Sequence, residues 1–233
     1  MSAPLLFLAA DPLECADWVA RWNEVRKVSL AVRWARAGKW KGRDVAAIAN
    51  GAGAERAFAA VVLAGNVSAV CNIGFCGALD ENLRVGDIFV ATEIRNGSRT
   101  YDAIRPKVAQ GVPDAASGVL ASIDRVARTA EEKRRLRAGG ASVVDMEAAG
   151  AAGAAADAGV PFYCVRVVSD LAGEDFANDF NAALTADGTF SAARLVIGAL
   201  ASPRQRLAEL VRLKHRAEMA SKKLGAFLAD CTF

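Results

Sequence analysis

The chain has 233 residues, of which 53% are hydrophobic and 24% are charged, and its formal net charge is +3. This composition supports a large apolar core and excludes a disordered chain, and so small a charge does not indicate a nucleic-acid partner. The first apolar run is too short for a signal peptide, and no run reaches the roughly 20 residues that span a bilayer. We therefore expect a cytoplasmic protein with no membrane partner.

Cysteine and histidine usage narrows the possible chemistry further. The five cysteines contain no C-x-x-C pair, which favours free thiols in a reducing compartment. The one histidine, His215, lies in a basic segment near the C-terminus, which makes a zinc site or a histidine-dependent catalytic triad improbable. We expect no metal or other cofactor, so any acid–base work must come from carboxylates, lysine, tyrosine or cysteine.

In chain order, short apolar runs alternate with alanine-rich helical patterns. We predict strands at residues 5–9, 45–50, 69–74, 86–94, 118–123, 141–145 and 162–168. Helices are predicted after the glycine turn at 51–53, over 129–139 with Thr129 as N-cap, over 146–159, and in the basic segment 204–223. The segment 96–117 lacks periodicity and is expected to be a long excursion that partly covers the site.

Strands that are apolar at every position are buried on both faces of a sheet. With helices between them, they predict one α/β domain over residues 1–233, a three-layer α/β/α arrangement with a central mixed sheet. Ligands bind beyond the carboxyl ends of the strands in such sheets, so residues directly after a strand are the candidates for function.

Carboxylates occupy several of these positions. Glu14 follows the first strand, Asp145 and Glu147 flank a strand-to-helix junction, and Asp170 ends the last apolar run. Each has an ordinary explanation, because acidic residues cap helices and occupy their first turns. Together they are expected to converge on one pocket, near the glycine turns at 51–53 and 74–77.

Three stretches carry a family resemblance: "NGAGAERAFAA", "VCNIGFCGALDENLRVGDIFVATEI" and "SVVDMEAAGAAGAAADAGVPFYCVRVVSDLAGE". With their spacing, they resemble the purine nucleoside phosphorylase and nucleosidase superfamily over nearly the whole chain, most closely the methylthioadenosine/S-adenosylhomocysteine nucleosidase-like branch. The resemblance implies a partly barrel-like central sheet and cleavage of the N-glycosidic bond of a nucleoside.

The resemblance also implies roles for individual residues. Asp170 matches the acid that protonates a leaving purine base. By its position in the chain, Ser169 is a candidate to share that proton, with backbone groups as the alternative. Met146 and Glu147 match the pair that holds the ribose, and Glu147 is expected to stay ionised near its helix N-terminus. The remaining implied substrate contacts are Phe75, Cys76 and Gly77 under the sugar and base, and Val126 where many members have phenylalanine. Phe176 and Phe180, after the Asp170 turn, are candidates for an apolar 5′-substituent pocket, and a place in the core is the alternative explanation for both.

The choice between water and phosphate depends on the loop after the first strand. Phosphorylases typically read GDPxR there, and this chain reads ADPLE, so Glu14 stands in place of the arginine. A second phosphate-binding stretch, typically RxGS, reads NIGF, with Asn72 and Phe75 in place of arginine and serine. Losing two arginines removes contacts worth about 1.5–3 kcal/mol each. The nucleosidase branch has a glutamate at the position of Glu14, where it activates water.

The sequence therefore predicts hydrolysis of a 5′-substituted purine nucleoside, methylthioadenosine, S-adenosylhomocysteine or futalosine-like, with Asp170 and Glu14 as the catalytic pair. A homodimer or higher homo-oligomer is expected from the family. Two alternatives stay open: a non-catalytic nucleoside-binding protein, and a phosphorylase whose phosphate site is rebuilt from Arg33, Arg36, Arg43 or Arg56.

Overall fold

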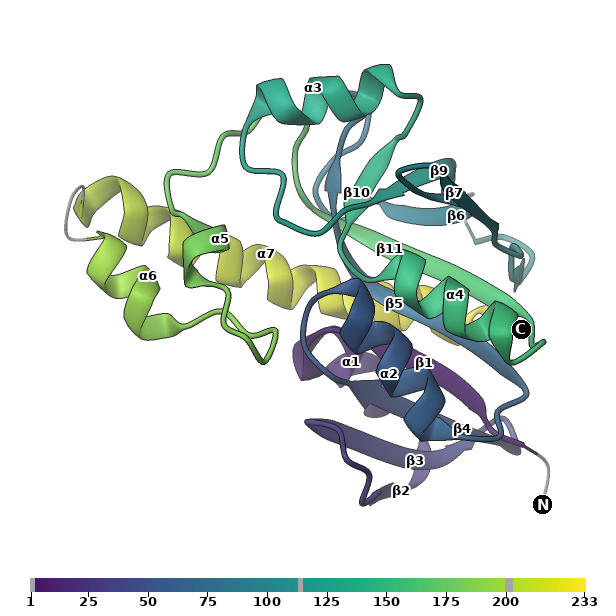
Figure 1. Ribbon diagram of the computed structural model, residues 1–233. Coiled ribbons are helices and arrows are strands. Elements are labelled where there is room, and N and C mark those ends of the chain that lie inside the picture. The colour runs from purple at the N-terminus through teal and green to yellow at the C-terminus, as the bar shows by residue number, and fades with distance from the viewer. Residues whose placement is uncertain (1–2, 113–114, 200–202) are drawn as a thin grey trace.

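The computed structural model describes residues 3–112, 115–199 and 203–233 and places them around one ten-stranded sheet (Figure 1). The sheet contains β1 (Leu5–Ala9), β2 (Asn23–Lys27), β3 (Trp34–Trp40), β4 (Arg43–Ala49), β5 (Ala69–Ala78), β6 (Ile88–Asn96), β7 (Arg99–Asp102), β9 (Ala116–Ser122), β10 (Val143–Asp145) and β11 (Phe162–Asp170). A separate two-stranded ladder joins β8 (Lys107–Val108) to β12 (Cys231–Thr232). The helices are α1 (Pro12–Val19), α2 (Ala54–Ala64), α3 (Ala130–Ala138), α4 (Ala148–Asp157), α5 (Phe180–Ala183), α6 (Ala192–Ala199) and α7 (Pro203–Ala229).

The sheet is mixed, and part of it closes on itself. Strands β4, β1, β5 and β11 run parallel, while β6 is antiparallel to β11 and parallel to β9. Strand β10 pairs with β9 and also returns to β5, which completes a ring of β5, β11, β6, β9 and β10. This arrangement confirms the predicted α/β class with a mixed, partly barrel-like sheet.

Helices cover both faces of the sheet, which explains why the strands are apolar at every position. Along β1, Leu6 and Leu8 point into the core that includes residues of α2 and α4. The alternate residues Leu5 and Phe7 point into a second core, which includes residues of α1 and α7. The small residues of α4 allow close packing, because a Cβ on Gly150 would lie 1.8 Å from the carbonyl oxygen of Ala54 in α2.

The structure departs from the sequence-based expectations at several places, and helices α1, α5 and α6 were not among the predicted helices. Strands β2 and β3 were not predicted, because β2 is exposed along its whole length and therefore lacks the apolar run of a buried strand. The excursion 96–117 forms β7 and β8 instead of a cover, and none of its described residues lines the cavity at the candidate site. Pro113 in this segment lies outside the described residues. Within the described ranges, no helix combines the length and the apolar character needed to cross a bilayer.

Candidate functional site

A cavity of about 240 Å³ lies beyond the carboxyl ends of β1, β5, β10 and β11. All ten site residues predicted from the sequence line it: Glu14, Phe75, Cys76, Gly77, Val126, Met146, Glu147, Ser169, Asp170 and Phe176. Asp145, which the sequence analysis grouped with the other carboxylates, also lines it. The lining further includes residues that sequence reasoning did not select: Ala10, Ala52, Arg125, Ala127, Val144 and Phe190. Strands β1, β5 and β11 run parallel and end at the same edge of the sheet, which brings together the residues at and after their ends.

Glu14 lies in the first turn of α1 and is held there by backbone amides. Its Oε2 accepts hydrogen bonds from the amides of Ala10 (2.8 Å) and Asp11 (3.1 Å), which forms a capping box with Asp11. Its Oε1 accepts from the amide of Phe75 in β5 (2.9 Å). Burial raises the pKa of Glu14, and these hydrogen bonds and the charge of Arg166 oppose the rise. The helix-capping explanation and the site position therefore apply to the same residue.

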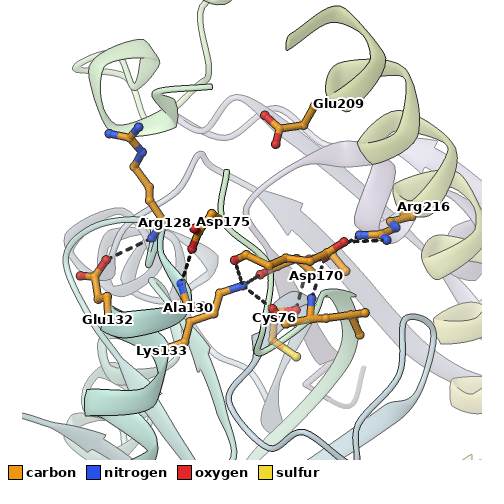
Figure 2. Close-up of polar contacts among 12 residues, drawn as sticks. Cys76, Arg128, Ala130, Glu132, Lys133, Asp170, Asp175, Glu209 and Arg216 are labelled. Atoms are coloured by element: carbon orange, nitrogen blue, oxygen red, sulfur yellow. Dashed lines mark hydrogen bonds and ion pairs between the residues drawn. The ribbon is translucent and has the colours of Figure 1, made fainter. Parts of the chain in front are cut away.

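Asp170 ends β11 opposite Gly77 of β5 and is nearly buried. The hydroxyl of Ser169 donates to its Oδ1 (2.8 Å), and the ammonium of Lys133, from α3, donates to its Oδ2 (2.5 Å), as Figure 2 shows for Lys133. Burial raises the pKa of Asp170, and the Lys133 charge works against that rise. A Cβ at position 77 would lie 2.9 Å from Oδ2, so the glycine makes room for the carboxyl group.

Beneath the cavity lies Arg166, a fully buried guanidinium group of β11. It donates to the side chains of Asp145 and Asn72 and to the carbonyl oxygen of Ile73 (3.1 Å). A Cβ on Gly74 would lie 2.7 Å from both Arg166 Nη1 and Glu14 Oε1, so this glycine is needed where the two side chains meet. Sequence reasoning did not assign Arg166 to the site, although a single arginine within an apolar strand was a signal for it.

Glu147 corrects an expectation about charge. Its Oε1 accepts from the amide of Gly53 (3.0 Å) at the start of α2. Burial, and then the nearby charge of Asp145, raise the pKa of Glu147 to about 8, so the helix N-terminus does not keep it ionised at neutral pH as predicted. Instead, Glu147 carries a proton over much of the neutral range.

The arginines considered for a rebuilt phosphate site lie elsewhere. Arg33 faces Asp187 (3.6 Å), Arg43 donates to the carbonyl of Phe233 (2.9 Å), and Arg56 donates to the carbonyl of Ala186. Arg36 donates to the carbonyl of Ala35 (2.8 Å). Among the described residues that line the cavity there is one arginine, Arg125, and it is paired with Glu132 (2.7 Å).

An aromatic group forms the other wall. Phe176 packs edge-on against Phe180 with ring centroids 5.2 Å apart, and Phe180 packs likewise against Phe190 at 5.8 Å. Phe176 and Phe190 line the cavity, and Phe180 supports both from behind. Val126 is fixed by Asn181, whose side chain accepts from the Val126 amide (2.8 Å) and donates to its carbonyl (3.0 Å).

The ion pair between Arg166 and Asp145 predicts a large stability effect. Arg166→Met leaves a buried carboxylate without its partner, so we expect a loss of about 3–5 kcal/mol in the free energy of unfolding by urea. In the double variant with Asp145→Asn, the loss is expected to be smaller than the sum of the two single losses. Additive losses would show that the two side chains do not support each other.

The raised pKa of Glu147 predicts a pH-dependent stability. The folded state holds its proton up to about pH 8, whereas the unfolded chain releases it near the ordinary glutamate value. The contribution of Glu147 to the free energy of unfolding is thus fully present below the ordinary glutamate pKa. It declines as the pH rises toward 8, by up to about 1.4 kcal/mol per pH unit.

Glu147→Gln is expected to flatten the decline between pH 6 and pH 8, measured by urea unfolding, because the amide does not titrate. The exposed Glu55→Gln on α2 serves as the control and is expected to leave the decline unchanged. An equal decline in wild type and Glu147→Gln contradicts the assignment.

Comparisons with known proteins identify the family to which this fold belongs. The sequence model of a family described as the phosphorylase superfamily matches residues 4–201. A 5′-methylthioadenosine/S-adenosylhomocysteine nucleosidase of Staphylococcus aureus (strain JH9) is 27% identical over 191 residues, which cover 70% of this chain and 84% of that protein.

Solved structures share the fold. A nucleosidase of the same name from S. pneumoniae, determined with a transition-state inhibitor, superposes with a TM-score of 0.74 at 16% identity and 97% coverage of both chains. Futalosine hydrolase of Helicobacter pylori strain 26695 gives a TM-score of 0.72 at 16% identity, with 97% of this chain and 95% of that chain covered. The family match extends over most of the sequence and confirms the predicted resemblance: this chain belongs to the phosphorylase superfamily.

Proposed function

We propose that this protein is a nucleosidase that hydrolyses the N-glycosidic bond of a 5′-substituted purine nucleoside and releases the free base. The observation that carries the proposal is a pair of buried carboxyl groups, Glu14 in the first turn of α1 and Asp170 at the end of β11, which line one cavity. Inverting glycoside hydrolysis needs such a pair, one group to protonate the leaving group and one to orient water. The names of the relatives support the same reaction.

In this proposal, Asp170 protonates the base as it leaves. An unperturbed aspartate is protonated about 0.1% of the time at neutral pH, so a raised pKa favours this role. Burial supplies that shift, and Ser169 orients the carboxyl group through its hydrogen bond to Oδ1. Glu14 activates water on the opposite side of the sugar, and Glu147 binds sugar hydroxyls beside Met146.

Water is preferred over phosphate as the second substrate. Arg166 is buried and engaged by Asp145, Asn72 and a backbone carbonyl, which leaves its guanidinium little capacity for a dianion. Glu14 adds a carboxyl group where an anion would have to bind, and the like charge repels it. These contacts favour hydrolysis over the phosphorylase alternative.

The aromatic wall indicates the 5′ substituent. Phe176 and Phe190 offer apolar surface next to the carboxyl pair, which suits a thioether or another apolar group. Methylthioadenosine and S-adenosylhomocysteine, the compounds in the name of the S. aureus relative, are therefore the first substrates to try, followed by futalosine.

A substrate panel tests the proposal. Purified protein is incubated with 5′-methylthioadenosine, S-adenosylhomocysteine, futalosine, adenosine and inosine, with and without inorganic phosphate, and the products are identified by mass spectrometry. We expect free base and free sugar at the same rate in both conditions. A phosphorylated sugar would support the phosphorylase, and tight binding without turnover would support the binding protein.

We further propose that the chain acts as a single cytoplasmic domain that assembles into a homodimer or higher homo-oligomer. The five buried free thiols fit a reducing compartment. Exposed Phe58, Val62 and Leu63 on α2 adjoin a groove of about 410 Å³ that α2 and α4 line, and this apolar surface suits a second copy of the chain.

A further inference from the structure

Lys133 is a buried lysine in α3, a helix that otherwise lies at the surface. It is the buried residue of α3, with a side chain that is 0% exposed, while neighbours such as Arg134 and Arg135 face solvent. Its Nζ reaches Asp170 Oδ2 (2.5 Å), as Figure 2 shows. It also reaches the carbonyl oxygens of Leu171 (2.7 Å) and Glu174 (3.5 Å). A lysine is rarely buried completely unless it is paired, so this contact is part of how the site is built.

The surroundings of the ammonium group form a closed set. Three acceptors face its three N–H bonds, and the ring of Phe176 lies 5.2 Å from Nζ. The nearby carboxylate of Glu174 is engaged by Arg216 of α7 through two contacts, 2.7 and 2.9 Å. Lys133 is therefore left to compensate one buried carboxyl group, that of Asp170.

This pairing places a second proton-carrying group, the Lys133 ammonium, on the leaving-group side of the cavity. A lone aspartate must be neutral to act as an acid, whereas an aspartate bonded to an ammonium group has a proton next to it even when it is ionised. Lys133 does not line the cavity, while Asp170 does. Any effect of Lys133 on the base must therefore pass through Asp170.

We propose that Lys133 is a positioning residue that shares one proton with Asp170, so that the acid acting on the leaving base is the Lys133–Asp170 pair. The inference rests on the proposed nucleosidase function. The proton moves from Nζ to the Asp170 carboxyl and from there to a ring nitrogen of the base, as the electron pair of the glycosidic bond passes to the base. The pair is left as a neutral amine and a carboxylate. The amine regains a proton from solvent, and the attacking water loses one to Glu14.

Other charged and titratable groups face the pair from the elements around it. They are Glu174 of the turn after β11, Arg216 of α7 and Cys76 of β5, with the hydroxyl of Ser169 beside the carboxyl group. Glu174 and Arg216 neutralise each other, and burial raises the pKa of the Cys76 thiol well above its usual value. Among these groups, Lys133 and Asp170 are thus left as the two that can pass a proton toward the base.

Two variants separate charge from proton supply. Lys133→Met removes both, and we expect kcat on the best purine substrate of the panel to fall about 10²-fold. Lys133→Arg retains the positive charge, but a guanidinium group does not give up its proton. The kcat of this variant is therefore expected to be reduced as in Lys133→Met. The exposed Arg134→Met, one residue along α3, is the matched control and is expected to retain wild-type kcat.

A second substrate distinguishes a proton defect from a folding defect. A p-nitrophenyl riboside with the same 5′ group releases a leaving group that needs no proton. Its kcat is expected to change little in Lys133→Met, because no proton from the pair is needed. Misfolding, by contrast, would lower both activities equally. In an Asp170→Asn background, Lys133→Met is expected to cause no further loss on the purine substrate.

The proposal is overturned by equal losses on both substrates, by wild-type kcat in Lys133→Met or Lys133→Arg, or by additive losses with Asp170→Asn. Failure of the proposed function gives a different result. In that case wild-type protein releases neither base nor nitrophenol. If wild type is active and Lys133→Met is unaffected, only the role of Lys133 is refuted.

Discussion

Asp170→Asn is expected to lower kcat on a purine nucleoside by about 10²–10⁴-fold, the usual contribution of a general acid. Asparagine retains the shape of the side chain and can still accept a hydrogen bond from Lys133, but it has no proton to deliver to the base. Substrate binding depends mainly on the rest of the cavity, so KM is expected to change much less than kcat. Steady-state release of base, followed by mass spectrometry or absorbance, measures both constants.

The control for this variant is Asp124→Asn, whose side chain is 89% exposed. It removes an equal charge from the protein and is expected to leave kcat unchanged. The p-nitrophenyl riboside adds a second check, since its leaving group needs no acid. Wild-type turnover of the purine nucleoside by Asp170→Asn would rule out Asp170 as the acid.

Glu14→Gln is expected to have an effect of similar size for a different reason. Turnover requires an ionised Glu14 to take a proton from water, and an amide does not do this, so we expect kcat to fall by about 10²-fold or more. Glu14 also accepts three backbone amides, and the new NH₂ group would face at least one of these donors. That mismatch is expected to cost about 1–3 kcal/mol of stability.

A comparison with Asp11→Ala separates the two effects of Glu14→Gln. Asp11 is the N-cap of α1, and its loss is expected to cost about 1 kcal/mol of stability without lowering kcat. The base role also predicts a pH effect in wild type. Because burial raises the pKa of Glu14, kcat should decline on the acid side at a pH above the ordinary range of a glutamate. If Glu14→Gln lost stability but retained kcat, Glu14 would be a helix cap and not the base.

Much of the fold was accessible from local sequence patterns. The predicted strands correspond to β1, β4, β5, β6, β9, β10 and β11, and the predicted helices to α2, α3, α4 and α7. These elements carry strong signals, because strands buried between two helical layers must be apolar at every position. The hairpin of β2 and β3 carries a weak signal, since an exposed edge strand is free to be polar.

The ten predicted site residues line one cavity, and their individual roles stay predictions until the variants above are measured. Lys133 escaped prediction because it lies among charged residues of an amphipathic helix, where a lysine ordinarily faces solvent. Phe190 comes soon after Phe176 and Phe180 in the chain, but nothing local to it indicates a ligand. Glu147 was found, but its charge was misjudged, because its burial, the largest cause of its raised pKa, is not a local property.

By itself, the sequence determined where the chain is apolar, where it turns, and which carboxylates follow a strand. These properties depend on neighbouring residues along the chain, so they can be read in order. Only the tertiary structure decided that Lys133 meets Asp170, that Arg166 is engaged by Asp145, and that Gly74 and Gly77 make room for the two carboxyl groups. Burial and charge act through space, and their effect on a proton depends on groups that the fold brings within a few ångströms.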